Sequence, residues 1–207
     1  MKHPTRIIGA LAQALSWALH PLVLPIYLVL LLFSQTAFAH FPPTIKWYLA
    51  GSVLLYGVLL PVFAICVLRY RGYLPDWKIG ERSQRITPLL IGACCYMLCA
   101  VTIGRIDSAL FLRKFMIASA CCELMCALVT TRWQISLHLT GMGAAVALLV
   151  VMNLLALSGM FMPLLWGVAA TGLLASARLY LGRHNPWQVL AGFVGGFAIT
   201  ITAIFFF

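Results

Sequence analysis

The chain has 207 residues, of which 63% are hydrophobic and only 9% are charged. Soluble domains carry about 25% charged residues, so this composition excludes a soluble globular protein. Fourteen Lys and Arg against four Asp and Glu give a net charge of +10. The basic residues are spread over short loops, which argues against nucleic acid as a partner and favours a bilayer with anionic headgroups.

Hydrophobic runs long enough to cross a bilayer recur along the whole chain. They predict an all-α protein, a polytopic transmembrane bundle of about six to seven spans. Residues 1–207 are expected to form a single transmembrane domain. The predicted spans cover residues 22–39, 45–68, 88–104, 113–131, 137–157, 161–181 and 187–206.

The segment before the first span is harder to assign. Residues 1–6 are short and basic, and the apolar stretch that follows is too long for the core of a signal peptide. Residues 7–20 either extend the first span or form a separate interfacial helix that Pro21 breaks from it. The three histidines at 3, 20 and 40 are flanked by no motif and are interpreted as interfacial.

The seven cysteines all fall inside hydrophobic runs, without an accompanying set of His or Asp. This favours small apolar core residues over a disulfide framework or a metal site. No carboxylate cluster suits a metal ion either, so no metal or other cofactor is expected.

Three loops hold most of the unusual polar residues. They join the second span to the third, the fourth to the fifth and the sixth to the seventh. In an alternating bundle these loops lie on one side of the membrane, so the polar residues should gather there. They are Lys78, Arg82, Arg85, Arg132, Ser136, His138, Arg183 and His184, with Arg178 at the end of the sixth span.

Each of these loops also leads into a predicted helix start. Thr87-Pro88 and Asn185-Pro186 have the pattern of an N-cap followed by the first helical residue, and Ser136 is a candidate cap for the fifth span. Helix N-termini present free amide donors and a positive dipole end, which bind anions and phosphate above all.

Three short patterns predict phosphoryl-transfer chemistry. They supply fixed cations, a hydroxyl and two imidazoles, which can neutralise phosphate oxygens, attack phosphorus and protonate a leaving oxygen. The patterns are Lys78 to Arg85 with Arg82 between them, Ser136-Leu137-His138, and Arg178 with His184 six residues later and Gln188 four further on.

These spacings resemble the type 2 phosphatidic acid phosphatase and haloperoxidase superfamily over about residues 78–192. Its signatures are Lys-x6-Arg-Pro, Pro-Ser-Gly-His and Ser-Arg-x5-His-x3-Asp. The resemblance implies a similar helical core and a metal-free reaction on phosphorylated lipids. His184 would be the nucleophile that forms a phosphohistidine, and His138 the general acid. The phosphate would be held by Lys78, Arg85, Ser136 and Arg178.

The chain departs from these signatures at five places. Pro88 stands two residues late, Ile135 replaces the proline and Leu137 the glycine of the second signature, and Ala177 replaces the serine of the third. Gln188 stands where the family has Asp. Its amide oxygen can accept the same ring N–H, but it supplies no negative charge to the nucleophilic imidazole.

Glu123 is the one carboxylate deep inside a predicted span. Ionisable residues within a membrane are functional candidates. Glu123 lies 13 residues before Ser136 in the sequence, about two turns below the helix end. A structural pairing, for example with Asn153, or a neutral protonated form is favoured over a catalytic role.

The leading hypothesis is a lipid phosphatase of a bacterial-type inner membrane. A lipid phosphotransferase and a catalytically degenerate phospholipid-binding or scaffold protein remain open alternatives, and a small transporter is a weaker one. The Lys and Arg distribution places the polar face in the cytoplasm by the positive-inside rule. The headgroup and the oligomeric state stay open.

Overall fold

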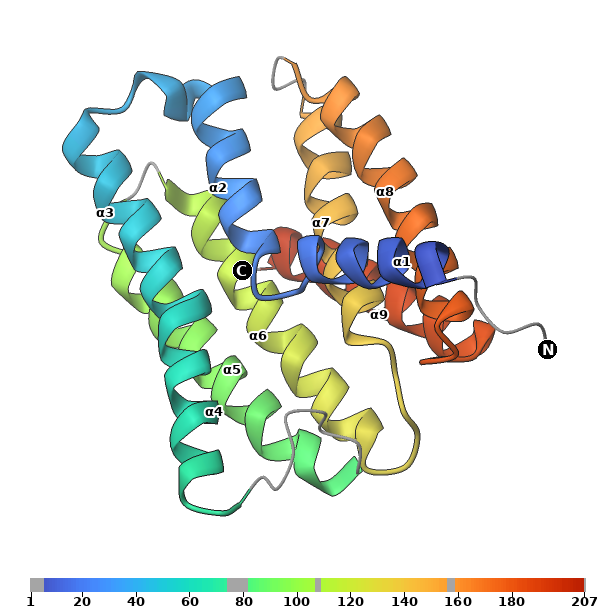
Figure 1. Ribbon diagram of the computed structural model, residues 1–207. Helices are drawn as coiled ribbons and strands as arrows, with labels where there is room; N and C mark the ends of the chain where they lie inside the picture. Colours follow the sequence, from blue (N-terminus) through green and yellow to red (C-terminus); the bar gives the residue numbers. More distant parts are fainter. Residues whose placement is uncertain (1–5, 74–81, 107–108, 156–158, 207) are drawn as a thin grey trace.

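The computed structural model describes residues 6–73, 82–106, 109–155 and 159–206, with the side chains of Ala37, Arg82 and Ser83 left out. All regular elements within these residues are helices (Figure 1). The α-helices are α1 (Arg6–Ala18), α2 (Leu24–Gln35), α3 (Pro43–Leu54), α4 (Leu60–Tyr70), α5 (Arg82–Ile103), α6 (Leu110–Thr130), α7 (Leu137–Leu154), α8 (Phe161–Tyr180) and α9 (Pro186–Phe206).

Within the described residues, five helical segments are long and apolar enough to cross a membrane. They are residues 43–70, 84–103, 137–154, 161–180 and 186–206. Helix α2 has 12 residues and is about 18 Å long, shorter than a hydrocarbon core of about 30 Å. Helix α6 is long enough, but Arg113, Lys114 and Glu123 interrupt its apolar sequence. These helices indicate an integral membrane protein.

The N-terminal apolar stretch forms a helix of its own. Helix α1 ends at Ala18, and a turn that includes Pro21 separates it from α2. It lies across the other helices, in contact with α8 (Figure 1). Ile7, Leu11 and Trp17 are exposed on it, whereas Ala12 and Ser16 are buried. Of the two alternatives that the sequence left open, the separate helix is therefore the one observed.

The second predicted span is continuous in spite of Pro61. Helices α3 and α4 are joined by a π-helical turn, Leu55–Leu59, so the helical segment runs from Pro43 to Tyr70. A π-turn just before a proline accommodates its missing N–H without ending the helix.

The predicted start of the third span is wrong. Helix α5 begins at Arg82, so Thr87 is not its N-cap and Pro88 lies inside the helix. Proline at this place removes one intrahelical hydrogen bond, the one that its N–H would make to Gln84. Because only two turns precede it, the cost is confined to the polar start of the helix, and the helix tolerates it.

The closest packing joins α7 to α9. A methyl group added at Gly196 would collide with the Thr140 carbonyl, and one at Gly192 would lie 2.7 Å from the Ser136 oxygen. Gly143 faces the Phe193 carbonyl equally closely. At each of these contacts a glycine of one helix faces a backbone carbonyl of the other, which confirms Gly192-x-x-x-Gly196 as a helix-packing motif.

The cysteines are free thiols, as expected. Four of them, Cys95, Cys99, Cys122 and Cys126, are buried. The Cys126 thiol lies 3.5 Å from the Thr140 hydroxyl, and Cys122 packs beside Gly196. These positions confirm core packing at the four buried sites, while Cys66 and Cys94 are exposed.

Candidate functional site

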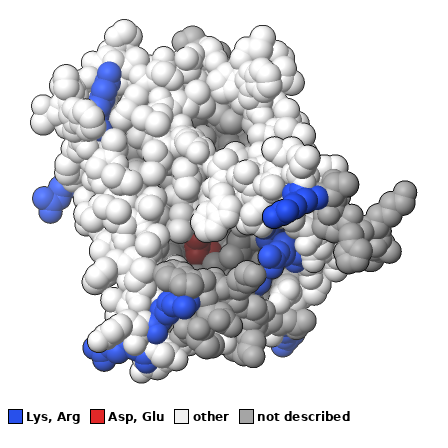
Figure 2. Space-filling model, in the orientation of Figure 1, with Lys and Arg blue, Asp and Glu red and all other residues white. Residues whose placement is uncertain are grey.

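A cavity of about 730 Å³ opens between α1, α5, α6, α7 and the end of α8. Polar residues from distant parts of the chain line it together with apolar ones. The cationic and imidazole residues of its lining are His20, Arg85, His138, Arg178, Arg183 and His184. Figure 2 shows a recess with acidic atoms inside it and Lys or Arg side chains at its border. The cavity therefore brings together residues from all three sequence patterns.

Two helix caps fix the spacing between Arg178 and His184. Helix α8 ends with Gly182 at a φ of +61°, and the Arg183 N–H donates to the Arg178 oxygen at 3.2 Å. This is a Schellman ending, which favours glycine at the left-handed residue. Asn185 then caps α9, because its Oδ1 accepts the Gln188 N–H at 2.9 Å. The predicted Asn185-Pro186 helix start is confirmed.

Gln188 has two roles at this turn. Its Oε1 accepts the Asn185 N–H at 3.2 Å, which completes a reciprocal capping box with the Asn185 side chain. The same oxygen accepts the Nδ1–H of His184 at 3.1 Å. That bond places the ring proton on Nδ1, so Nε2 of His184 keeps a free lone pair. The amide thus fixes the tautomer that a nucleophile needs.

His184 is held in its neutral form. Burial lowers the pKa of its imidazole to about 4, and the positive charges of Arg178, Arg85 and Arg183 contribute to the same shift. The hydrogen bond that His184 donates to Gln188 raises the pKa, but burial and the arginines lower it by more. A neutral ring next to three guanidinium groups is suited to attack an anion that those groups have bound.

His138 stands in the first turn of α7 and is tied to α1. Its Nε2 lies 3.1 Å from the Ser16 carbonyl oxygen, which can only accept, so Nε2 carries a proton. The ring of His20 meets it edge-on with 5.2 Å between the centroids. These contacts orient the His138 ring and leave its Nδ1 available for proton transfer.

The arginines supply the positive charge of the cavity. Arg178 belongs to the last turn of α8, and its buried Nε has no hydrogen-bond partner among the described residues. Arg85 lines the opposite wall from α5. Arg183, which belongs to none of the three sequence patterns, also lines the cavity. A guanidinium with an unused donor beside two others forms a suitable anion site.

Ser136 does not line the cavity. Its side chain is fully buried, its Oγ has no partner among the described residues, and it makes no capping bond to α7. The backbone N–H of Ser136 donates to the backbone carbonyl oxygen of Gln188 at 3.3 Å, so the residue packs between α7 and α9. Ser136 occupies the N-cap position, as predicted, but without the predicted hydroxyl bond.

Three further candidates have different outcomes. Leu137 lines the cavity beside His138. Lys78 lies outside the described residues, and so does the side chain of Arg82. The cationic wall that the structure describes therefore consists of arginines alone.

Glu123 also lines the cavity, although its place in the sequence suggested that it would be remote from His184. No hydrogen bond joins it to Asn153 or to any other side chain of the described residues. The predicted pairing with Asn153 is therefore not formed. Among the described parts of the chain, no group of three His, Cys, Asp or Glu could hold a metal ion.

Sequence reasoning missed the contribution of α1. His20 was interpreted as interfacial, but its ring contacts His138 and its Nδ1 accepts the Leu22 N–H at 3.3 Å. Gln13 and Trp17 line the cavity as well. No motif marks these residues, because they reach the site only through the tertiary contact between residues 16 and 138.

Comparisons with known proteins gave no match among family models, curated proteins or solved structures.

Proposed function

We propose that this protein is a lipid phosphatase that hydrolyses a phosphomonoester or pyrophosphate through a phosphohistidine on His184. One observation carries the proposal. His138 and His184 share a cavity with Arg85 and Arg178, and His184 is held as a neutral ring with a free Nε2. The motif spacing, which resembles the type 2 phosphatidic acid phosphatases, is the second support.

In the first step Nε2 of His184 attacks phosphorus. An N–P bond forms and the bond from phosphorus to the lipid oxygen breaks, with its electron pair going to that oxygen. The negative charge of the bound phosphate favours the positive form of His138, which then carries a proton on both ring nitrogens. His138 gives its Nδ1 proton to the leaving lipid alkoxide. Arg85 and Arg178 neutralise the equatorial phosphate oxygens, where the negative charge is spread in the transition state.

In the second step water attacks the phosphohistidine. His138, now neutral at Nδ1, accepts a proton from that water as the new P–O bond forms. The N–P bond breaks, its electron pair returns to Nε2 of His184, and inorganic phosphate leaves. The amide of Gln188 keeps the His184 ring in one orientation through both steps.

The apolar part of the lining suits the lipid portion of such a substrate. Leu89, Phe115 and Ala144 are among the apolar residues that line the cavity. In this proposal the protein resides in a bacterial-type inner membrane with the cavity at the cytoplasmic side, where most loop arginines lie. The six or seven spans that the sequence suggests would include α2 or α6 as well as the five longer segments.

The experiment is phosphate release from a panel of phosphorylated lipids by purified protein in detergent with EDTA. The wild type should release phosphate, and His184→Ala should lower the rate at least about 10³-fold because the nucleophile is gone. His40→Ala is the matched control, since this histidine is exposed and outside the cavity, and it should leave the rate unchanged. Equal rates in wild type and His184→Ala would overturn the proposal.

A second function, phospholipid binding without hydrolysis, is favoured by two observations. Gln188 supplies no negative charge to His184, and the buried Ser136 adds no donor to the cavity. In that case wild type and His184→Ala both bind lipid phosphates and neither releases phosphate. Gain of phosphate release in Gln188→Asp would then identify a catalytic site that has lost its acid.

A further inference from the structure

Glu123 places a carboxyl group in the cavity, and no described residue pairs with it. It is the only acidic side chain that the structure describes, and it forms no hydrogen bond or ion pair with another described residue. A carboxylate away from bulk water is costly unless a positive group or a hydrogen-bond donor pairs with it. Since Glu123 lines the cavity, a bound ligand can supply that group.

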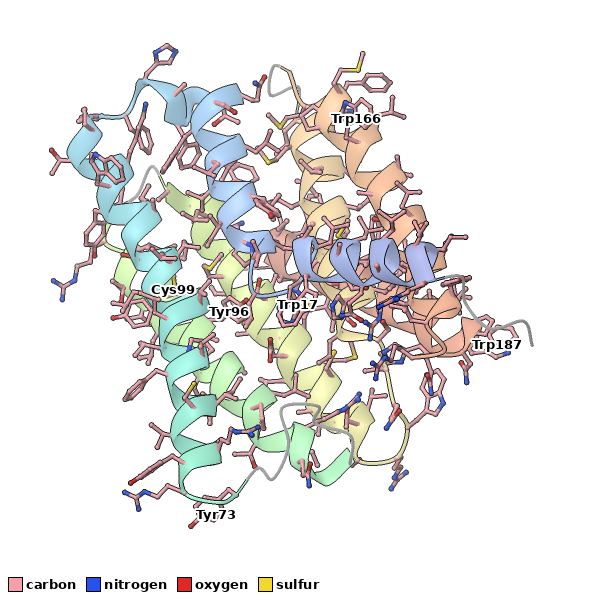
Figure 3. The ribbon with its side chains drawn as sticks, viewed as in Figure 1. Trp17, Tyr73, Tyr96, Cys99, Trp166 and Trp187 are labelled. Carbon is pink, nitrogen blue, oxygen red and sulfur yellow. The ribbon has the colours of Figure 1, made fainter. Side chains whose placement is uncertain are left out.

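The surroundings of Glu123 are those of an ammonium site. The carboxyl group lies against Gly92 of α5, where an added Cβ would stand 2.7 Å from Oε2. Tyr96, one turn further along α5, and Phe115 of α6 line the same cavity. Tyr96 is buried within the helical bundle, where Figure 3 labels it. Aromatic rings beside a carboxylate bind ammonium groups through their π faces and through charge.

The opposite charges of the cavity are separated. Arg85, Arg178 and Arg183 line it too, yet none of them forms an ion pair with Glu123. A ligand that carries only a phosphate would give the unused donor of Arg178 an acceptor and would leave the Glu123 carboxyl group unpaired. A ligand with both charges would pair each group with its opposite.

We propose that the cavity binds a lipid that carries a primary ammonium group as well as a phosphate, with the ammonium between Glu123 and Tyr96. The phosphate end of this assignment rests on the proposed function, whereas the ammonium end rests on Glu123 and its aromatic neighbours. Glu123 is then a specificity-determining residue that selects amino lipids over lipids without a positive charge.

Binding of two matched ligands to the purified protein tests this inference. The probes are a phosphonate analogue of a long-chain amino-alcohol phosphate and its N-acetylated form, which differ in the charge on nitrogen. Their P–C bond cannot be hydrolysed, so the result does not depend on catalysis. The wild type should bind the amine at least about tenfold more tightly than the N-acetyl form.

Glu123→Gln keeps the shape of the side chain and its ability to accept a hydrogen bond, but removes the charge. This variant should lose the preference for the amine while its affinity for the N-acetyl form stays unchanged. Tyr96→Phe should retain the preference, because the ring remains. Thermal unfolding of each variant verifies that it is folded, and Glu123→Asp, which keeps the charge, replaces Glu123→Gln if the latter does not fold.

Two results would overturn the inference. One is equal affinity of the wild type for the two probes. The other is an unchanged preference for the amine in Glu123→Gln. Where Glu123→Asp replaces that variant, the contradicting result is a preference equal to that of the wild type although the carboxylate stands further from the ligand. If neither probe binds and no lipid phosphate is hydrolysed, the proposed function fails as well. If the protein releases phosphate from lipids but shows no preference for the amine, the ammonium site is contradicted and the proposed function stands.

Discussion

Helix α7 has two sides that differ in packing and in chemistry. On one side Thr140 and Gly143 meet α9 backbone to backbone, with no room for an added methyl group. On the other side His138, Gly141 and Ala144 border the cavity of about 730 Å³. One helix thus takes part both in a backbone-to-backbone contact and in the lining of the cavity.

The difference explains how the two histidines hold their places. His138 stands at the start of α7 and His184 directly precedes α9. Because interdigitated backbones are hard to displace, the contact between these helices fixes the separation of the two rings. In the cavity, Nε of Arg178 has no hydrogen-bond partner among the described residues and so remains available to a ligand. Close packing on one side of α7 therefore positions the reactive groups on the other.

The largest expected effect comes from removing charge on the cavity side. Arg178→Gln should lower kcat/KM for a lipid phosphate about 10²-fold, because a preorganised donor to the transferring phosphoryl group is lost. Arg105→Gln is the control, since Arg105 is exposed and does not line the cavity. A similar kcat/KM in the two variants would show that the arginines of the cavity only determine topology.

Adding a methyl group on the packed side should cost stability. Gly196→Ala brings a Cβ against the Thr140 carbonyl and should destabilise the fold by about 1–3 kcal/mol. Gly172→Ala on α8 meets nothing within 4 Å and should be neutral or stabilising, because alanine favours the helix. Thermal unfolding in detergent measures both variants. Equal melting temperatures would contradict the close contact of α7 and α9.

Placing the acid of the family signature at position 188 should raise the activity of the cavity site. Gln188→Asp places a negative charge beside His184 and stabilises its positive form when the ring attacks phosphorus. We expect kcat to rise about tenfold, less than the effect of an acid in a serine-protease triad, because bound phosphate is already anionic. A steady-state rate below that of the wild type would instead indicate that the capping role of Gln188 dominates.

The smallest expected effect is a displaced pH profile. Burial and the arginines lower the pKa of His184 from 6.5 to about 4, so the ring is neutral and reactive above that pH. As pH falls through about 4 the ring gains a proton and loses its lone pair, so kcat/KM should fall there. In Gln188→Asp the acid limb should move to higher pH. If the activity of the wild type instead falls near pH 6.5, His184 has the ordinary pKa of an exposed histidine, and neither burial nor the arginines act on it.

Much of the helical architecture could be predicted from local sequence signals. The apolar runs located α5 to α9 to within a few residues, apart from the start of α5. The Asn185-Pro186 cap was correct because a capping side chain contacts only its own first turn. Pro88 misled the prediction, because a proline is tolerated inside a helix near its start. Fewer helices than predicted are long and apolar enough to span a membrane, because α2 has only 12 residues and charged residues interrupt the apolar sequence of α6.

The candidate site was only partly accessible to sequence reasoning. The spacing of Arg178 and His184 is local, and two helix caps set it. The contact of His20 and Ser16 with His138 joins residues more than a hundred positions apart, and no periodic pattern encodes it. For the same reason the presence of Glu123 in the cavity could not be inferred, because it depends on how α5 and α6 pack around Gly92.

The most direct test of the central claim is to trap the covalent intermediate. Protein mixed with a lipid that carries a radiolabelled phosphate, and denatured with alkali within one turnover, should retain label that acid removes, as a phosphohistidine does. Peptide analysis should locate the label on His184, and His184→Ala should retain none. Turnover of the lipid without label on the protein, or label in His184→Ala, would contradict the account.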